Sequence, residues 1–364
     1  MRIAVIGAGI IGLTCAYELV RAGHSVELFD EEPASGATHA AAGMLSPAGE
    51  AWYGEESLLR LGLASAALWP ELAARLTRDS GIDIDHRTGG TLLVGRDRDD
   101  VELVARTMTL LAEHGIEAHA LDRSGLLETE PGLSDRISGG AVLPADHSVN
   151  PRQTAAALMA VLGDRLHRVK ARPDVVDGRC RGVVAGSRRS ADAVVVATGH
   201  RLNELLPGRT VRPVRGEVIR VRSDDPPRRT IRASIHGRPV YVVPRAGGEV
   251  VIGATSEEHA DAPLPTVGGV LRLLSDAREL LPTLDRADIL DITSRYRPGT
   301  PDNGPLIGPT SIPGLYVAGG HHRGGVLLAP LTAAAIRAHL EGGVVPVAAR
   351  PFLPQRFEHQ WSTV

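Results

Sequence analysis

The sequence predicts an α/β protein, in which a Rossmann-like domain built on a parallel sheet carries an inserted antiparallel-sheet (α+β) domain. Residues 1–6 read as a short apolar strand that runs directly into a glycine-rich turn, and residues 13–22 have the apolar spacing of a buried helix. Residues 193–199 again have the character of a strand buried on both faces. The alternation typical of antiparallel strands follows at residues 211–222, 240–243 and 249–254.

The opening strand, turn and helix form a dinucleotide-binding fingerprint. Gly7 permits the tight turn, Gly9 lets backbone approach a pyrophosphate, and Gly12 lets helix and strand pack closely. Ile10 and Ile11 lie between these glycines, where the positive end of the helix dipole and free N–H groups would meet the phosphates. The pattern predicts dinucleotide binding and leaves NAD and FAD open.

A carboxylate stands where the fingerprint requires one. The second strand, residues 25–29, ends at Asp30, eighteen positions beyond Gly12. A carboxylate at this point accepts the ribose hydroxyls of a bound dinucleotide. Glu31 is the alternative for the same role.

Composition excludes several classes of function. The 364 residues suffice for two domains, and a net charge of -3 gives no tendency to bind nucleic acid. Cys15 and Cys180 form neither a disulfide framework nor a metal site. Without a secretion signal or an apolar run of roughly 20 residues, we expect a cytoplasmic protein outside the membrane.

The stretch at residues 35–47 is dense in small residues, which suits either a segment pressed against a flat ligand or a close-packed pair of helices. Asn150 as N-cap and Pro151 at the first helical position predict a helix through residue 162. Other expected elements are helices at 58–78, 97–114, 267–281 and 326–340, strands at 89–94, 166–169, 289–297 and 315–318, a hairpin around 178–186, a turn-rich boundary at 131–144 and a loop at 298–313.

Further motifs follow the fingerprint in order. They are Ala41-Ala42-Gly43-Met44-Leu45-x-Pro47, Ala197-Thr198-Gly199, Tyr241-Val242-Val243-Pro244-Arg245, Gly253-Ala254-Thr255, Arg297-Pro298-x-x-x-Asp302 and Gly320-His321-His322-Arg323-x-Gly325-Val326-Leu327-Leu328-Ala329-Pro330. Together they resemble the FAD-dependent D-amino-acid-oxidase-like amine oxidases, most closely the glycine oxidases of thiamine biosynthesis. The resemblance spans residues 3 to 330.

The resemblance implies non-covalently bound FAD and a carboxylate-bearing amine as substrate. By position, Arg297 would pair with the substrate carboxylate, Tyr241 would assist by hydrogen bonding, Arg323 would lie near flavin and substrate, and Met44 near the isoalloxazine. A guanidinium offers a carboxylate two parallel donors, which would aim the substrate Cα–H at flavin N5 for hydride transfer. The imine would hydrolyse to an α-keto acid, dioxygen would reoxidise the flavin to give hydrogen peroxide, and no side-chain acid or base is required.

The fingerprint and the resemblance together give an expected FAD-binding set. It comprises Gly7, Gly9, Ile10, Ile11, Gly12, Asp30, Glu31, Thr38, His39, Ala42, Gly43, Met44, Ala197, Thr198, Gly199, Gly320, His322, Arg323, Gly324, Gly325, Val326 and Leu327. The final helix would direct its N-terminus, near Gly325 and Val326, at the pyrimidine side of the flavin. We expect residues 1–85, 140–210 and 295–364 in the FAD-binding domain and residues 86–139 and 211–294 in the substrate-binding domain.

Some positions depart from the family pattern. His322 and Gly324 replace an aromatic residue and an asparagine, and Ser256 stands where glycine oxidases can carry an apolar pocket residue. A more polar or open pocket leaves room for an alternative, an amine oxidase or dehydrogenase that tailors a larger amino acid. A pyridine-nucleotide dehydrogenase would need a second fingerprint, which we do not find. A tRNA-modifying relative is disfavoured by the net charge and by the coverage of the whole chain by one flavoprotein pattern, and a non-catalytic flavin-binding protein is a further alternative. The resemblance also suggests a homo-oligomer.

Overall fold

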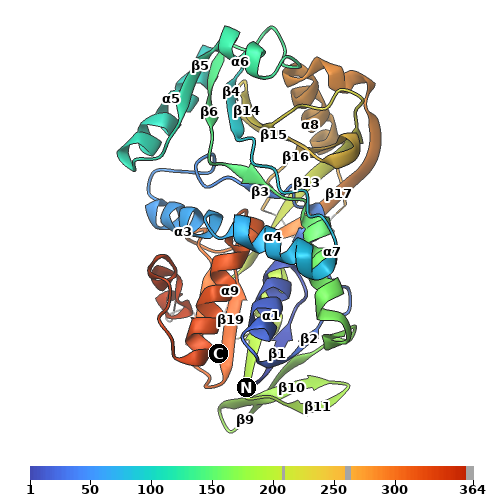
Figure 1. The fold of residues 1–364 in the computed structure, drawn as a ribbon, viewed down its shortest axis with the longest axis vertical. Helices are drawn as coiled ribbons and strands as arrows, with labels where there is room; N and C mark the ends of the chain where they lie inside the picture. Colours follow the sequence, from blue (N-terminus) through green and yellow to red (C-terminus); the bar gives the residue numbers. More distant parts are fainter. Residues whose placement is uncertain (207–209, 259–263, 358–364) are drawn as a thin grey trace.

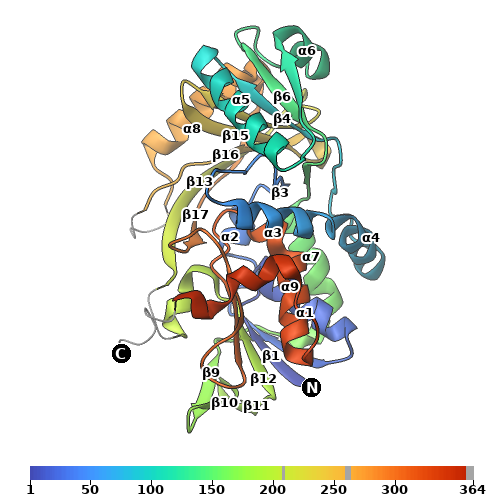
Figure 2. The same ribbon diagram turned by 90° about the vertical axis from the view of Figure 1, so that its left-hand side faces the viewer.

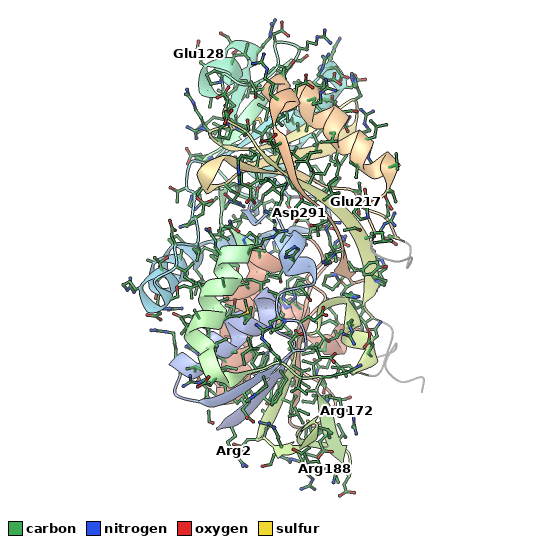
Figure 3. The ribbon with its side chains drawn as sticks, turned by 90° about the vertical axis from the view of Figure 1, so that its right-hand side faces the viewer. Arg2, Glu128, Arg172, Arg188, Glu217 and Asp291 are labelled. Atoms are coloured by element: carbon green, nitrogen blue, oxygen red, sulfur yellow. The ribbon has the colours of Figure 1, made fainter. Side chains whose placement is uncertain are left out.

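The computed structural model describes residues 1–206, 210–258 and 264–357. Two large sheets lie one above the other along the long axis of the molecule (Figure 1). Arg2 and Arg188 lie at one end of this axis, Glu128 at the other, and Asp291 between them (Figure 3). The expected domain boundaries stay a prediction.

The first sheet has six strands. In spatial order they are β18 (Leu306–Pro309), β19 (Leu315–Gly319), β12 (Ala193–Val196), β1 (Arg2–Ile6), β2 (Ser25–Phe29) and β8 (Leu166–His167). All neighbouring strands are parallel except β18 and β19. The chain therefore leaves this sheet and returns to it, as predicted for a Rossmann-like domain with an insertion.

The two faces of this sheet are covered differently. Ile3 and Val5 of β1 pack among helices α1 (Ile10–Arg21), α7 (Pro151–Leu162) and α9 (Gly325–Glu341). Ala4 and Ile6 face the opposite side, which is covered by a three-stranded meander. Its strands are β9 (Arg172–Val176), β10 (Arg179–Ala185) and β11 (Ser187–Ser190).

The second sheet has eight strands and is mixed. In spatial order they are β17 (Asp288–Gly299), β13 (Arg212–Arg222), β16 (Glu249–Gly253), β15 (Arg238–Pro244), β14 (Thr230–Ile235), β4 (Thr91–Gly95), β6 (Gly139–Leu143) and β5 (His119–Asp122). The antiparallel pairing expected for residues 211–222, 240–243 and 249–254 is confirmed, and one other pair of strands in this sheet, β14 and β4, is parallel. Helices α8 (Val267–Leu280) and α6 (Arg123–Thr129) cover one face, and α5 (Arg98–Glu113) lies against β4 and β6 on the other.

The segments between the sheets hold the shorter elements. They are α2 (Ala37–Ala40), β3 (Met44–Leu45) with its partner β7 (His147–Ser148), α3 (Glu56–Ala66) and α4 (Trp69–Ser80). Short 3-10 helices occur at Gly163–Arg165, Gly199–Glu204, Ala246–Gly248, Pro282–Arg286, Val347–Phe352 and Pro354–Phe357. In Figure 2, α2 lies between the upper and the lower sheet.

Three expected elements are wrong in detail. The single helix at residues 58–78 is two helices, because Pro70 has no N–H to donate to the carbonyl of Ala66, where α3 ends. The turn-rich boundary at 131–144 contains β6, and the loop at 298–313 contains β18. In β6 a Cβ on Gly140 would stand 2.0 Å from the Leu93 carbonyl oxygen, so close strand pairing explains the glycine that made the segment resemble a turn.

The two local signals at helix starts had different outcomes. The cap of α7 is confirmed, because the Asn150 side chain accepts hydrogen bonds from the backbone N–H of Arg152 and Gln153. Helix α1 begins at Ile10, three residues before the expected start, so Ile10, Ile11 and Gly12 form its first turn.

Candidate functional site

A cavity of about 830 Å³ is lined by residues from both sheets. Many of the predicted site residues line it, although they come from eight separate stretches of the chain. These are Gly7, Gly9, Ile10, Ile11, Asp30, Glu31, Thr38, Ala42, Gly43, Met44, Ala197, Thr198, Gly199, Tyr241, Ser256, Arg297, His322, Arg323, Gly325 and Val326. The fold therefore gathers the fingerprint and the expected substrate residues around one space.

One end of the cavity lies where strands β1, β2 and β12 end. Gly7 turns there with φ +102°, and a Cβ on it would stand 2.5 Å from the Ala197 carbonyl oxygen. The Asp30 carboxylate accepts hydrogen bonds from the backbone N–H of Ala8 at 2.7 Å and Glu32 at 2.9 Å, which fix its direction. Each of its oxygens keeps a further lone pair for a hydroxyl donor.

This end has the groups that a dinucleotide requires. Helix α1 starts after Gly9 without a side-chain cap, and the Thr38 hydroxyl accepts from the N–H of Ile10 at 2.9 Å. The buried hydroxyl of Thr198 has no hydrogen-bond partner among the described residues, although it borders the cavity. A helix N-terminus that begins after a glycine and a buried free hydroxyl suit phosphate and sugar oxygens, so the residues present fit FAD.

Four arginines hold the backbone of the small-residue stretch against the cavity. Arg295 donates to the carbonyl of Ser35 at 2.8 Å, Arg152 to that of His39 at 2.9 Å, Arg220 to that of Ala41 at 3.1 Å, and Arg245 to that of Ala42. Burial lowers the pKa of Arg245 to about 9. This stretch therefore forms a wall of the cavity, and its short helix α2 also packs against α7, so both of the predicted uses of its small residues occur.

The other end of the cavity is built on the eight-stranded sheet. The phenol of Tyr241 lies over Gly253, where a Cβ would stand 2.2 Å from the hydroxyl. Arg297 donates from Nη1 to the carbonyl of Thr255 at 3.0 Å, and within the described part of the chain it forms no ion pair. Burial raises the pKa of Tyr241, and the positive charge of Arg297 opposes this only in part. The phenol is therefore neutral at pH 7 and able to donate.

The loop before α9 brings two histidines to this end. Burial lowers the pKa of His322 to about 4, with Arg323 and Arg297 adding to the effect. Burial alone lowers the pKa of His321 to about 3, and its Nε2 lies 2.9 Å from the Thr332 hydroxyl. Both imidazoles are neutral at pH 7, while Arg323 is exposed at the rim.

Five residues of the expected FAD-binding set lie outside the lining of this cavity. Gly12 packs against the Gly7 carbonyl, Gly320 against Thr300, and His39 has its Nε2 2.9 Å from Arg152. Gly324 and Leu327 border a smaller adjoining cavity of about 40 Å³.

Sequence reasoning missed two charged residues that line the cavity. Arg232 of β14 and Glu50 form an ion pair of 3.1 Å between Nη1 and Oε1. It also missed Asp146, which accepts hydrogen bonds from the Ser46 hydroxyl and from the N–H of Ala48 and Gly49. Glu50 lies three residues beyond the end of the small-residue stretch at residues 35–47, and this proximity is the one signal for it in the sequence.

Comparison with known proteins identifies the class to which this site belongs. Residues 2–338 match the family described as FAD dependent oxidoreductase. Glycine oxidase from Geobacillus kaustophilus is 33% identical over 342 residues, covering 91% of this chain and 90% of that protein. The crystal structure of glycine oxidase from the same organism superposes with a TM-score of 0.89 at 32% identity, covering 97% of this chain and 98% of that one.

A longer relative is also similar. The bifunctional protein ThiO/ThiG from Trichormus variabilis is 33% identical over 374 residues, covering 99% of this chain and 56% of that protein. The chain thus spans about half the length of that relative.

The fold and the site define an enzyme that uses FAD. The chain belongs to the family of FAD dependent oxidoreductases, which confirms the resemblance seen in the sequence. Across residues 1–206, 210–258 and 264–357, no helix is both long and apolar enough to cross a membrane. The same residues contain no group of three or more side chains arranged to hold a metal ion.

Proposed function

We propose that this protein oxidises the carbon–nitrogen bond of a small amino acid or amine, such as glycine, sarcosine or a D-amino acid. The observation that carries the proposal is that Arg297 and Tyr241 face the same cavity as the dinucleotide fingerprint. FAD, when bound, supplies the acceptor for the two electrons of a hydride from the substrate Cα. The products would be an imine, which hydrolyses to an α-keto acid, and hydrogen peroxide when dioxygen accepts the electrons. Similarity to glycine oxidases supports the substrate class.

Arg297 would bind and orient the substrate carboxylate. Its Nη1 is held by the Thr255 carbonyl, so the guanidinium is fixed before a substrate arrives. The remaining donors of a planar guanidinium match the two oxygens of a carboxylate. Tyr241 would add a neutral O–H donor from the neighbouring part of the sheet. Two donors on rigid strands restrict the substrate to one orientation.

The chain does not need to hold a catalytic acid or base near the reacting carbon. The neutral amine would lose a hydride without proton transfer at Cα. Both histidines of the loop before α9 line this end, and the pKa of His321, about 3, leaves it unprotonated at pH 7. The pKa of His322, about 4, leaves it unprotonated as well. Its role in this proposal is packing beside the substrate, together with Met44, Arg323 and Ser256.

The test is an anaerobic absorbance spectrum of the purified protein before and after addition of glycine, sarcosine, D-alanine and D-proline in turn. Bleaching of the oxidised flavin by glycine or sarcosine, with recovery in air and release of peroxide, is the expected result. A flavin that none of the four reduces would overturn the choice of small substrates. If the reduced flavin is reoxidised by an artificial electron acceptor but not by air, the protein is a dehydrogenase and not an oxidase.

A second candidate substrate class is a larger amino acid. The cavity continues beyond Tyr241 to side chains of α5, among them Leu103, Thr107 and Leu110. Ser256 is exposed at its wall, so a longer substrate side chain meets no apolar plug there. This extension favours an amine oxidase or dehydrogenase with a substrate longer than glycine.

A further inference from the structure

Arg232 occupies the cavity wall on the side of Tyr241 that faces away from Arg297. Strands β14 and β15 pair so that Arg232 lies directly opposite Tyr241, and its side chain is 21% exposed. Cross-strand neighbours in an antiparallel pair share one face of the sheet. Arg232 and Tyr241 therefore face the same space.

The guanidinium of Arg232 is only partly used by the protein. Nη1 donates to Glu50 at 3.1 Å and approaches the Met44 sulfur at 3.4 Å. For Nε and Nη2 the described residues provide no acceptor, although both atoms belong to a side chain that lines the cavity. The edge formed by these two atoms has the parallel donors that bind a carboxylate in bidentate fashion.

The residues around Arg232 form a built site. A Cβ on Gly49 would stand 2.9 Å from Cδ of Arg232, so the arginine lies against bare backbone. The turn that carries Gly49 and leads to Glu50 is fixed by the buried carboxyl of Asp146, which accepts from the N–H of Ala48 and Gly49. The position of Arg232 is thus set by packing and by an ion pair.

The spacing of the two guanidiniums defines the length of a ligand that could reach both. Arg297 lies over Gly216 of β13, and β13 is separated from β14 by β16 and β15. The strand register places Arg232 across from Val218, two residues along β13 from Gly216. Three inter-strand spacings and this offset separate the backbone positions of Gly216 and Arg232 by roughly 16 Å. Among the described residues, the lining of this end includes four positively charged side chains and one carboxylate, that of Glu50. The positive side chains are Arg106, Arg232, Arg297 and Arg323. The excess positive charge favours a ligand with two acidic groups.

We propose that Arg232 binds a second acidic group of the substrate. The substrate class is then an amino acid with a further carboxylate, carried either on its side chain or on a substituent of its nitrogen. This inference rests on the proposed function, in which Arg297 binds the α-carboxylate. Glu50 keeps Nη1 of Arg232, and the distal carboxylate takes the Nε and Nη2 edge.

The first test measures binding without turnover. The FAD-loaded protein is titrated with acetate and propionate, and in parallel with malonate, succinate and glutarate, while the flavin absorbance is followed. We expect at least one dicarboxylate to have a Kd roughly tenfold or more below the Kd of the monocarboxylates. This difference in Kd should disappear in Arg232→Met. Arg181→Met, a substitution of an exposed arginine in β10, is the control and should keep the difference. Equal affinities for mono- and dicarboxylates would overturn the proposal.

The second test compares matched substrates for anaerobic flavin reduction. Iminodiacetate is set against sarcosine, and D-aspartate and D-glutamate against D-alanine. We expect the dicarboxylic member of at least one pair to react faster, and Arg232→Met to lower its kcat/KM roughly tenfold more than that of its partner. Reduction by sarcosine or D-alanine with no gain from the second carboxylate would overturn the role of Arg232 and leave the proposed function standing. If no compound reduces the flavin, the proposed function fails, and the carboxylate titration alone decides the role of Arg232.

Discussion

The guanidinium of Arg297 lies flat on the α-carbon of Gly216. A Cβ at Gly216 would stand 2.1 Å from Nη1 and 2.5 Å from Cζ of Arg297. The two residues are on neighbouring strands, β13 and β17, where Val214 is the direct partner of Arg297. The glycine thus creates the space in which the proposed carboxylate-binding group rests.

Replacing this glycine should displace the arginine without disturbing the backbone. Gly216→Ala puts a methyl group where Nη1 now lies, so we expect the KM for carboxylate-bearing substrates to rise roughly tenfold. Gly268→Ala, at a position in α8 with open space around it, is the control and should leave KM unchanged. Steady-state kinetics of both variants and the wild type with the best carboxylate-bearing substrate measures the change in KM. The same KM in both variants would show that the position of Arg297 does not govern binding.

Arg297→Lys tests the geometry of the carboxylate contact. A lysine keeps the positive charge but replaces a planar fork by a point charge, so we expect KM to rise roughly tenfold or more. The absorbance of the bound flavin, measured in the same samples, serves as the control for a correctly folded cofactor site. An unchanged KM would remove Arg297 from the substrate site.

Gly43 and Gly54 form a matched pair for a test of the wall beside the cavity. Both have a positive φ, +79° and +86°, but a Cβ on Gly43 would stand 2.0 Å from the Val149 carbonyl oxygen, whereas Gly54 has open space around it. Gly54→Ala should cost only the strain of the left-handed backbone, about 1 kcal/mol. Gly43→Ala adds overpacking of about 1–3 kcal/mol and should weaken FAD retention. Urea unfolding and the ratio of flavin to protein after gel filtration check both effects, and equal losses would contradict the crowding at Gly43.

Elements with a strong local signal were predictable from the sequence. Four elements begin within about one residue of their expected first residue. They are β1, β2 and β12, with their apolar runs, and α7, with its Asn150-Pro151 start. Strand β6 lies in a segment that the sequence predicts as a turn-rich boundary, and no strand is predicted at β14, because both pair with the distant strand β4. Strand β18 lies in a predicted loop and pairs with the next strand, β19, but its Gly308-Pro309 end is typical of a loop. Pairing with a distant strand leaves no periodic pattern in a short segment.

Some residues of the candidate site were predictable from local motifs, and others are placed only by the pairing of strands. Residues within recognisable motifs, such as Asp30, Tyr241 and Arg297, line the cavity as expected. Arg232 could not be found, because nothing local distinguishes it among the many arginines of this chain. Only the register of β14 against β15 places it beside Tyr241. Gly12 and His39 lie outside the cavity lining, since one packs helix against strand and the other lies beside Arg152.

The buried carboxyl of Asp146 should make stability depend on pH. Desolvation raises its pKa from 3.8 to about 6, against the opposing hydrogen bonds from Ser46, Gly49 and Ala48. A raised pKa means that the folded state binds the proton more tightly than the unfolded state between these two values, so stability falls as pH rises from about 4 to 6. At 1.36 kcal/mol per pKa unit, the loss from this group is about 3 kcal/mol.

Asp146→Asn removes this titration, so the unfolding free energy of the wild type relative to the variant should fall by about 3 kcal/mol between pH 4 and pH 7. Urea unfolding of both proteins at a series of pH values measures the difference. Asp177→Asn, at an exposed turn position with a positive φ that asparagine tolerates, is the control and should leave the pH profile as in the wild type. A constant difference between the wild type and Asp146→Asn across this range would show that folding does not raise the pKa of Asp146. The turn at residues 46–49, which carries the chain to Glu50, would then be held by a charged carboxylate.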